Sequence, residues 1–327
     1  MSLQATGSGL AASTADESAA IIAAGSQSFA AASRLLPRDI RQRAQMLYAW
    51  CRWCDDVMDG QELGHGALVL TSAERADRLA ELRERTQAAL ASPAPAQGLP
   101  FRALQLAAAG GGEGAALRIA PRWTVEHLEG FAMDVEPRPF ADLDALLLYC
   151  WRVAGVVGVM MALVMDVAAD DLATLRRAQD LGLAFQLTNI ARDVCEDARN
   201  GRVYLPVDWL AEVGLGPEPE GLLKPESAPA VADVVRRLVE AAEPYYRSSG
   251  AGLPVLSLSC AWGIATARGV YREIGREVAR GGVETLARRV STSGTQKAVL
   301  ALTALGPALG SRLPLRPEPR PDLWTAI

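Results

Sequence analysis

The chain has 327 residues, of which 50% are hydrophobic and only 6% are aromatic. Its formal net charge is -5 and its 33 Lys and Arg residues are spread along the sequence, which argues against a nucleic-acid partner. The five cysteines are irregularly spaced, and the first residues lack the charged and apolar regions of a secretory signal. Both features predict free thiols in a reducing cytosol.

Apolar residues recur with helical spacing through almost the whole chain, and strand-like patterns are nearly absent. Residues 1–16 are small and polar, and they are predicted to form a disordered tail. Helices are then predicted at residues 17–34, 38–59, 72–92, 100–109, 124–133, 142–166, 170–199, 229–247, 255–281 and 293–309. Pro and Gly cluster between these segments, and residues 311–327 form a Pro-rich tail. One all-α domain over residues 17–310 is therefore expected.

The most apolar part of the chain is the run at residues 153–165. It is shorter than the roughly 20 residues that cross a bilayer, so it is predicted to be a buried core helix. Gly155 and Gly158 lie on nearly one face of this helix, and two interpretations remain open for them. They allow close approach either of a neighbouring helix or of a ligand.

The first of two unusual polar stripes lies in the segment RWCDDVMD and the residues before it. On a helix with about 100° per residue, Tyr48, Arg52, Asp55 and Asp59 fall within about 60° of one another. The surrounding residues are largely apolar. A buried carboxylate is costly unless a cation neutralises it, so this stripe requires an explanation.

The second stripe comprises Gln186, Asn189, Asp193 and Asp197 in the segment around NIARDVCED. A divalent metal shared by two carboxylate pairs would neutralise them, and Mg²⁺ commonly combines one or two carboxylates with phosphate oxygens. Two such pairs suit metals that bridge a diphosphate. An apolar helical cavity would then exclude water from the carbocation left when the diphosphate departs.

Charged residues beside the stripes have less specific interpretations. Asp56 and Glu196 lie about 60–100° off their stripes, so we expect them either to support the stripe residues or to face solvent. Arg192 is also off the stripe and is expected to pair with a nearby acid. Cys51 and Cys54 form a CxxC sequence within a helical pattern, without the context of a redox or zinc motif, and are predicted to be core thiols.

Five segments in order carry a resemblance to a known family: GSQSFAAASRLLPRDIRQRAQMLYAWCRWCDDVMDG, LEGFAMDV, YCWRVAGVVGVMM, LGLAFQLTNIARDVCEDARNGRVYLP and AWGIATARGVYREIG. Together they resemble the bacterial phytoene synthases of the squalene and phytoene synthase family. The fourth segment is more similar to the carotenoid branch than to the squalene branch. The resemblance implies a single-domain isoprenoid-synthase-type helical bundle around a central apolar cavity.

The resemblance also implies roles for single residues. The metal ligands would be Asp55, Asp59, Asp193 and Asp197, holding Mg²⁺ with Mn²⁺ as an alternative, and no nicotinamide cofactor is expected. The residues implied to take part in the chemistry are Tyr48, Arg52, Tyr149 and Tyr271. Packing in the core is an equally supported interpretation of the three tyrosines.

Substrate contacts are implied for a further set: Ser26, Ser28, Phe29, Arg52, Gln186, Asn189 and Arg289. The chain departs from the family pattern at Gln27, where many relatives carry Lys, and at Ala30, where an aromatic residue is frequent. These departures lie in the same segment as the first three residues of the set.

The activity implied by the resemblance is that of a prenyltransferase of carotenoid biosynthesis, which condenses two geranylgeranyl diphosphates through prephytoene diphosphate to phytoene. Two alternatives remain open. One is squalene or dehydrosqualene synthesis from farnesyl diphosphate, and the other is a non-catalytic isoprenoid-binding or assembly protein. Because substrates and products of these reactions are lipids, a cytoplasmic protein with peripheral contact to the inner face of the membrane is expected.

Overall fold

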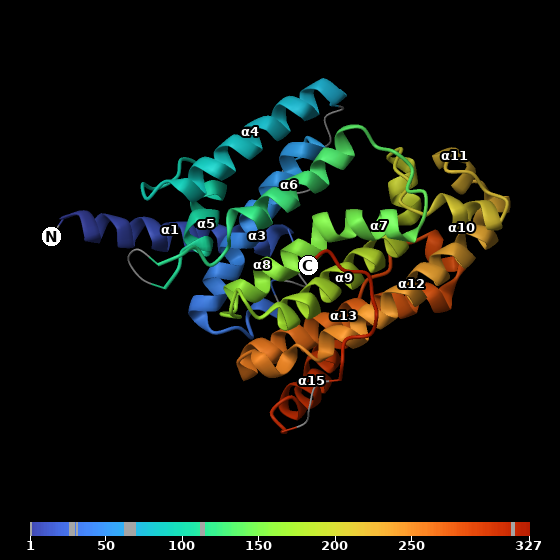
Figure 1. Ribbon diagram of the computed structural model, residues 1–327. Helices are drawn as coiled ribbons and strands as arrows, with labels where there is room; N and C mark the ends of the chain where they lie inside the picture. Colours follow the sequence, from blue (N-terminus) through green and yellow to red (C-terminus); the bar gives the residue numbers. More distant parts are fainter. Residues whose placement is uncertain (1, 26–29, 31, 62–69, 112–114, 315–317) are drawn as a thin grey trace. The chain divides into compact units, whose positions relative to one another are not determined.

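The computed structural model describes residues 2–25, 30, 32–61, 70–111, 115–314 and 318–327, with side chains from residue 9 onward. These ranges are largely helical and contain no strand, as predicted (Figure 1). The longer helices are α1 (Ser2–Gly25), α3 (Arg38–Asp59), α4 (Ser72–Ala91), α5 (Leu99–Ala108), α6 (Pro121–Val135), α7 (Leu143–Cys150), α8 (Val156–Val164), α9 (Leu172–Arg199), α12 (Ala228–Gly250), α13 (Leu258–Gly281) and α15 (Gly294–Gly310). The shorter elements are η1 (Trp151–Gly155), α10 (Val207–Glu212), α11 (Pro219–Leu222), η2 (Pro225–Ser227), η3 (Leu253–Val255) and α14 (Val283–Leu286).

Local capping chemistry explains why most helix ends fall close to their predicted positions. Thr71 and Glu74 form a capping box at the start of α4, and Ser293 and Gln296 form another at the start of α15. Helix α3 ends at Gly60, whose φ of 65° is in the left-handed region that glycine adopts without strain. Helices α10, α11 and α14 were missed because four to six residues carry too little periodic signal.

The N-terminal segment differs from its prediction as a disordered tail, because residues 2–16 belong to α1. The side chains of Thr14 and Ser18 are fully buried. Arg102 Nε on α5 donates to Thr14 Oγ1 at 2.8 Å, and α1 packs against α3 and α5. Small residues allow this close packing, an effect of tertiary structure that composition does not reveal.

The chain forms two compact units whose segments alternate in the sequence. Unit 1 comprises residues 1–136 and 160–170, and unit 2 comprises residues 137–159 and 171–327. The predicted boundaries of one domain, at residues 17 and 310, and its central apolar cavity stay predictions.

In unit 1, α3 packs against α1, α4 and α5, and α4 packs against α6. The indole of Trp50 is fully buried at the centre of this packing. Its Nε1 donates to Thr86 Oγ1 at 3.3 Å, and its ring centroid lies 5.3 Å from that of His127 on α6. This core fixes the side of α3 that is turned into unit 1.

In unit 2, α9 packs against η1, α12 and α13. Glycines permit direct backbone contact between α9 and the η1–α8 segment. A Cβ atom on Gly182 would lie 2.7 Å from the Cα atom of Gly155, and one on Gly158 would overlap the carbonyl oxygen of Ala178. Close helix packing is therefore the interpretation of Gly155 and Gly158 that the structure confirms.

The apolar run predicted as a core helix is part of a longer helical segment, residues 143–164, which has 22 residues. The argument from its shortness was therefore wrong, because this segment is long and apolar enough, by length and composition, to cross a membrane. However, 67% of its most apolar window is buried inside the fold. That burial is typical of a core helix in a globular protein.

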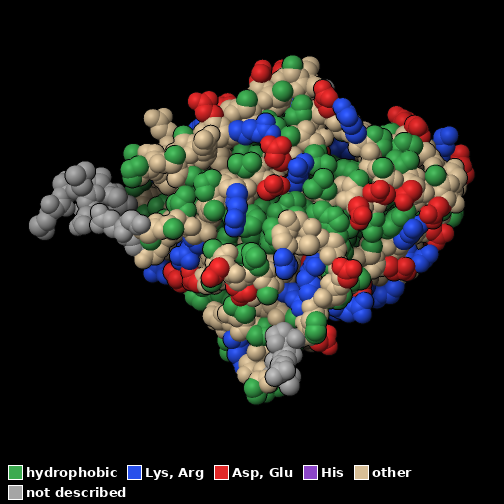
Figure 2. Space-filling view, viewed as in Figure 1, with side chains coloured by type: hydrophobic (Ala, Val, Ile, Leu, Met, Phe, Trp, Pro, Cys, Tyr) green, Lys and Arg blue, Asp and Glu red, His purple; other side chains and the backbone are tan. Residues whose placement is uncertain are grey.

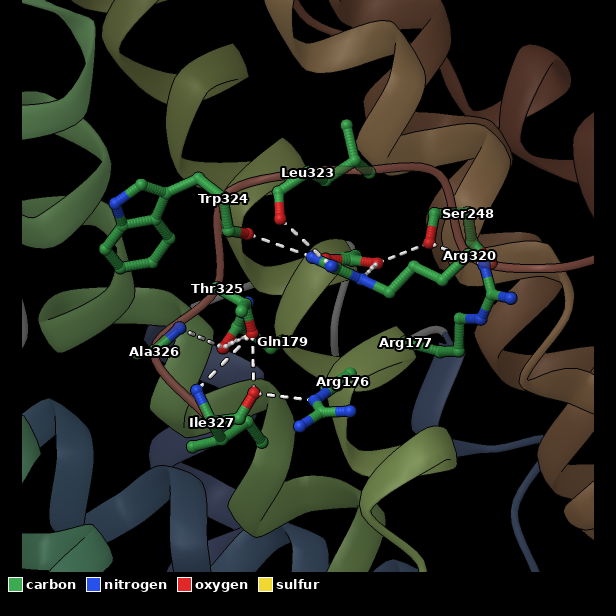
Figure 3. A network of polar contacts seen from close by, with 11 residues as sticks. Arg176, Arg177, Gln179, Ser248, Arg320, Leu323, Trp324, Thr325, Ala326 and Ile327 are labelled. Atoms are coloured by element: carbon green, nitrogen blue, oxygen red, sulfur yellow. Dashed lines mark hydrogen bonds and ion pairs between the residues drawn. The ribbon is translucent and has the colours of Figure 1, made fainter.

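Residues 318–327 pack along α9, although the sequence predicted a simple Pro-rich tail (Figure 3). Arg320 donates to both carboxylate oxygens of the fully buried Asp180, at 2.8 and 2.9 Å, and Ser248 Oγ donates to the same carboxylate. The backbone N–H of Ala326 donates to Gln179 Oε1 at 3.1 Å. On α9, Asp180 lies on the side opposite to the aspartate stripe.

Candidate active site

Helix α3 is regular from Arg38 to Asp59, so it holds Tyr48, Arg52, Asp55 and Asp59 on one face, as predicted. The phenol of Tyr48 lies against Gly25 at the end of α1. A Cβ atom at Gly25 would be 2.6 Å from the Tyr48 hydroxyl oxygen, so glycine is needed there to make room for it.

Arg52 is held by Asp56, the aspartate just off the stripe. Its Nη2 atom donates to Asp56 Oδ1 at 2.6 Å, and Asp56 is only 7% exposed. Of the two interpretations left open for Asp56, support of a stripe residue is therefore confirmed and solvent exposure is wrong.

Asp55 lies in an unfavourable electrostatic environment. Burial raises the pKa of its carboxyl group to about 7, and Arg52 offsets only part of this rise. The neighbouring carboxylates of Asp59, Asp56 and Asp134 raise the pKa further. Asp134, in the last turn of α6, was not predicted as a neighbour of this group. The negative charge of the cluster thus exceeds what Arg52 offsets, and a divalent cation would supply the missing positive charge.

On α9, the predicted stripe of Gln186, Asn189, Asp193 and Asp197 also lies on one face of a continuous helix. The side-chain amide of Asn189 donates to Gln186 Oε1 at 3.4 Å. Asp197 resembles Asp55, because burial raises the pKa of its carboxyl group to about 7 and Asp193 adds to the rise. Arg202 offsets part of it.

Asp193 differs from Asp197 because two arginines hold it. Arg192 donates to both its carboxylate oxygens, with Nε at 2.8 Å from Oδ1. Arg289 approaches from the segment after α14, with Nε 3.2 Å from Oδ1. The prediction that Arg192 pairs with a nearby acid is confirmed. Arg289, predicted to bind substrate, lies beside the aspartate stripe. Its Nη1 atom is also 3.9 Å from Oε2 of the exposed Glu196.

Tyr271 on α13 belongs to the same group of residues. Burial raises the pKa of its hydroxyl, and the charges that act on it are those of Arg192, Asp193 and Arg289. Its ring stacks on Phe185 of α9, with centroids 4.2 Å apart. The phenol therefore remains protonated at neutral pH and is fixed in orientation.

Tyr149, the other tyrosine predicted in unit 2, lies in an aromatic cluster. It stacks on Tyr204, with centroids 5.2 Å apart and hydroxyl oxygens 3.4 Å apart, and Phe140 packs against both rings. Sequence reasoning missed Tyr204, although it lies in the quoted segment ending GRVYLP. Tyr149 lies in the last turn of α7, just before the π-helix η1. A π-helical turn is a local irregularity that often marks functional sites.

Three predicted substrate-binding residues, Ser26, Ser28 and Phe29, lie outside the described residues, as does Gln27. The CxxC residues Cys51 and Cys54 are buried free thiols whose pKa values burial raises. They fit the predicted core role.

Carboxylates are the ligand type that the stripes on α3 and α9 offer to a metal ion. Within the described ranges, no group of three or more His, Cys, Asp or Glu side chains is placed to hold a metal ion by itself. Paired carboxylates with few further protein ligands fit Mg²⁺, which retains waters and takes phosphate oxygens from a substrate. The residues present therefore fit Mg²⁺ bound together with a diphosphate.

An all-α fold with paired aspartates on two helices is the arrangement that the sequence predicts for a helical enzyme of prenyl diphosphate chemistry. The chain belongs to the squalene/phytoene synthase family, whose model matches residues 22–296. It is 49% identical over 302 residues to the 15-cis-phytoene synthase of Enterobacter agglomerans, covering 92% of this chain and 98% of that relative. The 15-cis-phytoene synthase of Pantoea ananas is 48% identical over 304 residues, covering 93% and 94%.

Solved structures show the same fold. A dehydrosqualene synthase in complex with a ligand aligns with a TM-score of 0.77 at 24% identity, covering 90% of this chain and 96% of that one. The squalene synthase of Alicyclobacillus acidocaldarius aligns with a TM-score of 0.68 at 19% identity, covering 83% and 94%. The predicted family, fold class and prenyltransferase class are thus confirmed.

Proposed function

We propose that the protein condenses two molecules of geranylgeranyl diphosphate through prephytoene diphosphate to phytoene, without a nicotinamide cofactor. The observation that carries this proposal is the 49% identity, over 92% of the chain, to an enzyme named 15-cis-phytoene synthase. The two aspartate stripes on α3 and α9 agree with it, because both retain paired carboxylates on one helix face.

In this proposal Asp55 and Asp59 on α3, and Asp193 and Asp197 on α9, hold Mg²⁺, with Mn²⁺ as an alternative. When bound, Mg²⁺ neutralises diphosphate oxygens and makes the diphosphate a better leaving group. The carboxyl groups of Asp55 and Asp197 have pKa values of about 7 in the free protein. A bound cation would favour their ionised forms.

The arginines would bind the diphosphate directly. In the free protein Arg52 is held by Asp56 and Arg289 by Asp193, so both guanidinium groups are already positioned beside the aspartate stripes. A guanidinium group binds phosphate oxygens with two parallel hydrogen bonds. Binding of diphosphate would therefore replace or extend these carboxylate contacts.

Uncharged side chains would complete the site. The amides of Gln186 and Asn189, which already contact each other, can donate hydrogen bonds to phosphate oxygens. The ring of Tyr271, fixed on Phe185, can stabilise a nearby carbocation through its face. Tyr48 and Tyr149 are proposed to act similarly, and Ser26, Ser28 and Phe29 are proposed to contact substrate.

The test is to incubate the purified protein and Mg²⁺ with geranylgeranyl or farnesyl diphosphate, with and without NADPH, and to identify the hydrocarbon by mass spectrometry. We expect a forty-carbon product from geranylgeranyl diphosphate without NADPH. A thirty-carbon product from farnesyl diphosphate alone would replace the proposal with the squalene or dehydrosqualene alternative. Absence of diphosphate release with either substrate would support a non-catalytic binding protein.

A matched pair of variants separates metal ligands from other aspartates. Asp55→Ala should lower the rate by about a hundredfold or more, because the departing charge loses stabilisation. Asp77→Ala, which removes an exposed aspartate of α4, is the control and should retain the parent rate. Equal rates for both variants would contradict the metal assignment of Asp55.

A further inference from the structure

The C-terminal clasp, defined as residues 318–327, is held by polar side chains in the first half of α9 (Figure 3). Arg177 donates from Nη2 to the backbone oxygen of Glu318 at 2.6 Å, and Arg176 donates from Nε to that of Ile327 at 2.6 Å. Most of the clasp is exposed on its outer side, and Figure 2 shows hydrophobic side chains bordering the place where Figure 1 marks the end of the chain. The clasp is therefore a surface segment that is fastened to one helix at both of its ends.

The centre of the clasp is the ion pair of Arg320 with Asp180, whose side chain is fully buried. The guanidinium group donates from Nε and Nη2 to the two carboxylate oxygens at 2.9 and 2.8 Å, and it also donates to the backbone oxygens of Leu323 and Trp324 at 3.0 and 2.9 Å. Ser248 of α12 donates to the same carboxylate. Asp180 thus joins α9, α12 and the clasp at one point, and a two-pronged contact of this kind is directional.

The other contacts of α9 are less directional than this ion pair. The contact of Gly182 with Gly155 has no side chains to interdigitate, and apolar packing such as that of Leu183 and Leu187 tolerates small changes of shape. A buried ion pair adds little net stability compared with apolar side chains of similar size, because both charges lose their hydration. Its directed hydrogen bonds are instead suited to fix the rotation of α9 about its axis.

The contacts of α12 continue from the clasp toward the aspartate stripe. Ser248 and Tyr246 lie in the last turns of α12, and the Tyr246 hydroxyl oxygen is 2.8 Å from Oγ1 of Thr188, the residue before Asn189 of the stripe. The centroid of the Tyr246 ring also lies 6.2 Å from that of Phe185. Helix α12 thus contacts α9 both at the ion pair and beside the stripe, so a shift at the first point displaces the second.

Rotation of α9 would misplace the carboxylates of Asp193 and Asp197. A carboxylate oxygen lies about 6 Å from the helix axis, so a rotation of about 10° moves it by about 1 Å. A displacement of that size costs about a hundredfold in rate when it affects groups that bind the reacting atoms. The carboxylates in the second half of α9 are therefore sensitive to small changes at the clasp in its first half.

We propose that Arg320 and Asp180 are positioning residues, because the C-terminal clasp fixes the rotation of α9 and thereby aims Asp193 and Asp197 at the diphosphate and its metal. The inference rests on the proposed function only in taking these two aspartates as ligands of Mg²⁺. It does not depend on the length of the prenyl chains, so a thirty-carbon product would leave it intact.

The experiment measures the binding of pyrophosphate in the presence of Mg²⁺ by titration calorimetry, and kcat for diphosphate release, in variants of the full chain. Arg320→Met with Asp180→Asn removes the ion pair without leaving a buried charge, and Arg320→Lys keeps the charge but not the two-pronged contact. The control is Arg312→Met, because Arg312 fastens another segment of unit 2 by hydrogen bonds to the backbone oxygens of Leu253 and Leu256 rather than to α9. All proteins are compared at a temperature at which circular dichroism melts show them to be folded.

We expect the double variant to bind pyrophosphate about tenfold more weakly than the parent and to lose about ten- to a hundredfold in kcat, with Arg320→Lys in between. Arg312→Met should match the parent in both measurements. A role in stability alone would lower only the melting temperature, because a folded variant would then hold its carboxylates as the parent does.

Parent-like pyrophosphate affinity and kcat in the folded double variant would overturn the inference and leave the proposed function intact. If the double variant does not fold, the same result with Arg320→Lys would overturn it. Failure of the parent to bind pyrophosphate with Mg²⁺ would overturn the metal assignment of the proposed function and this inference with it.

Discussion

Replacing Asp197 with Asn should stabilise the ligand-free protein, whereas the same replacement at Asp193 should destabilise it. The two residues lie four apart on one face of α9, but their surroundings differ. Asp193 receives hydrogen bonds from Arg192 and lies 3.2 Å from Arg289. Burial, together with the charge of Asp193, raises the pKa of the Asp197 carboxyl group to about 7. Removing its charge therefore removes a repulsion.

The magnitude follows from the pKa of Asp197. A rise from the ordinary value of 3.8 to about 7 corresponds to about 4 kcal/mol at roughly 1.4 kcal/mol per pH unit. Because the side chain is only partly buried, we expect about half of this, ~2 kcal/mol, to appear as stabilisation. That gain would raise the melting temperature by about 3 °C for a chain of this size.

Asp193→Asn removes an ion pair whose two side chains are 15% and 13% exposed. The cost should lie between that of a surface pair and that of a fully buried pair, at about 2 kcal/mol. The two variants should thus move the melting temperature in opposite directions. Both should lose most of the activity, because each removes a proposed metal ligand.

The effect at Asp197 should depend on pH in a defined direction. A folded pKa above the unfolded one means that the ionised carboxylate destabilises the fold. This penalty is absent below pH 3.8, grows between pH 3.8 and about 7, and is complete above that range. The stabilisation by Asp197→Asn should therefore be largest at pH 8 and less than half as large at pH 5.

Thermal melts of the parent and both variants at pH 5 and pH 8, without metal, measure these differences. Destabilisation by Asp197→Asn at pH 8 would refute the reasoning, because it would mean that the carboxylate is favourably paired in the fold. A stabilisation of equal size at both pH values would also contradict it, since the gain would then not arise from ionisation.

Three further outcomes are expected. Mg²⁺ alone should raise the melting temperature little, whereas Mg²⁺ with pyrophosphate should raise it clearly, because the metal completes its coordination shell with phosphate oxygens. Equal shifts of the melting temperature under the two conditions would contradict this. Arg320→Met should lower the free energy of unfolding by about 3–5 kcal/mol in denaturant titrations, because it removes the guanidinium group that pairs with the fully buried Asp180. Adding Asp180→Asn should recover part of this loss. Replacing both Cys51 and Cys54 with Ser should cost stability but leave the rate of diphosphate release near that of the parent at a temperature where the variant is folded; an inactive but folded variant would show that these thiols have a role beyond packing.

Local features of this protein follow from the sequence by itself. The range predicted for α3, residues 38–59, coincides with the helix in the structure. The common face of Asp55 and Asp59, and that of Asp193 and Asp197, require only the number of residues between them and the regular geometry of a helix. Capping residues such as Ser293 act within one turn, so helix ends are also encoded nearby.

Only the tertiary structure decided which groups surround those aspartates. Arg289 reaches Asp193 across 96 residues of sequence, and Asp134 comes to act on Asp55 from another helix. The C-terminal segment, predicted as a tail, supplies Arg320 to the buried Asp180. Burial and the charges around an ionisable group set its pKa, and both depend on which helix faces meet. Spacing along one helix contains no information about that meeting, so the sequence identified the carboxylates but not their electrostatic state.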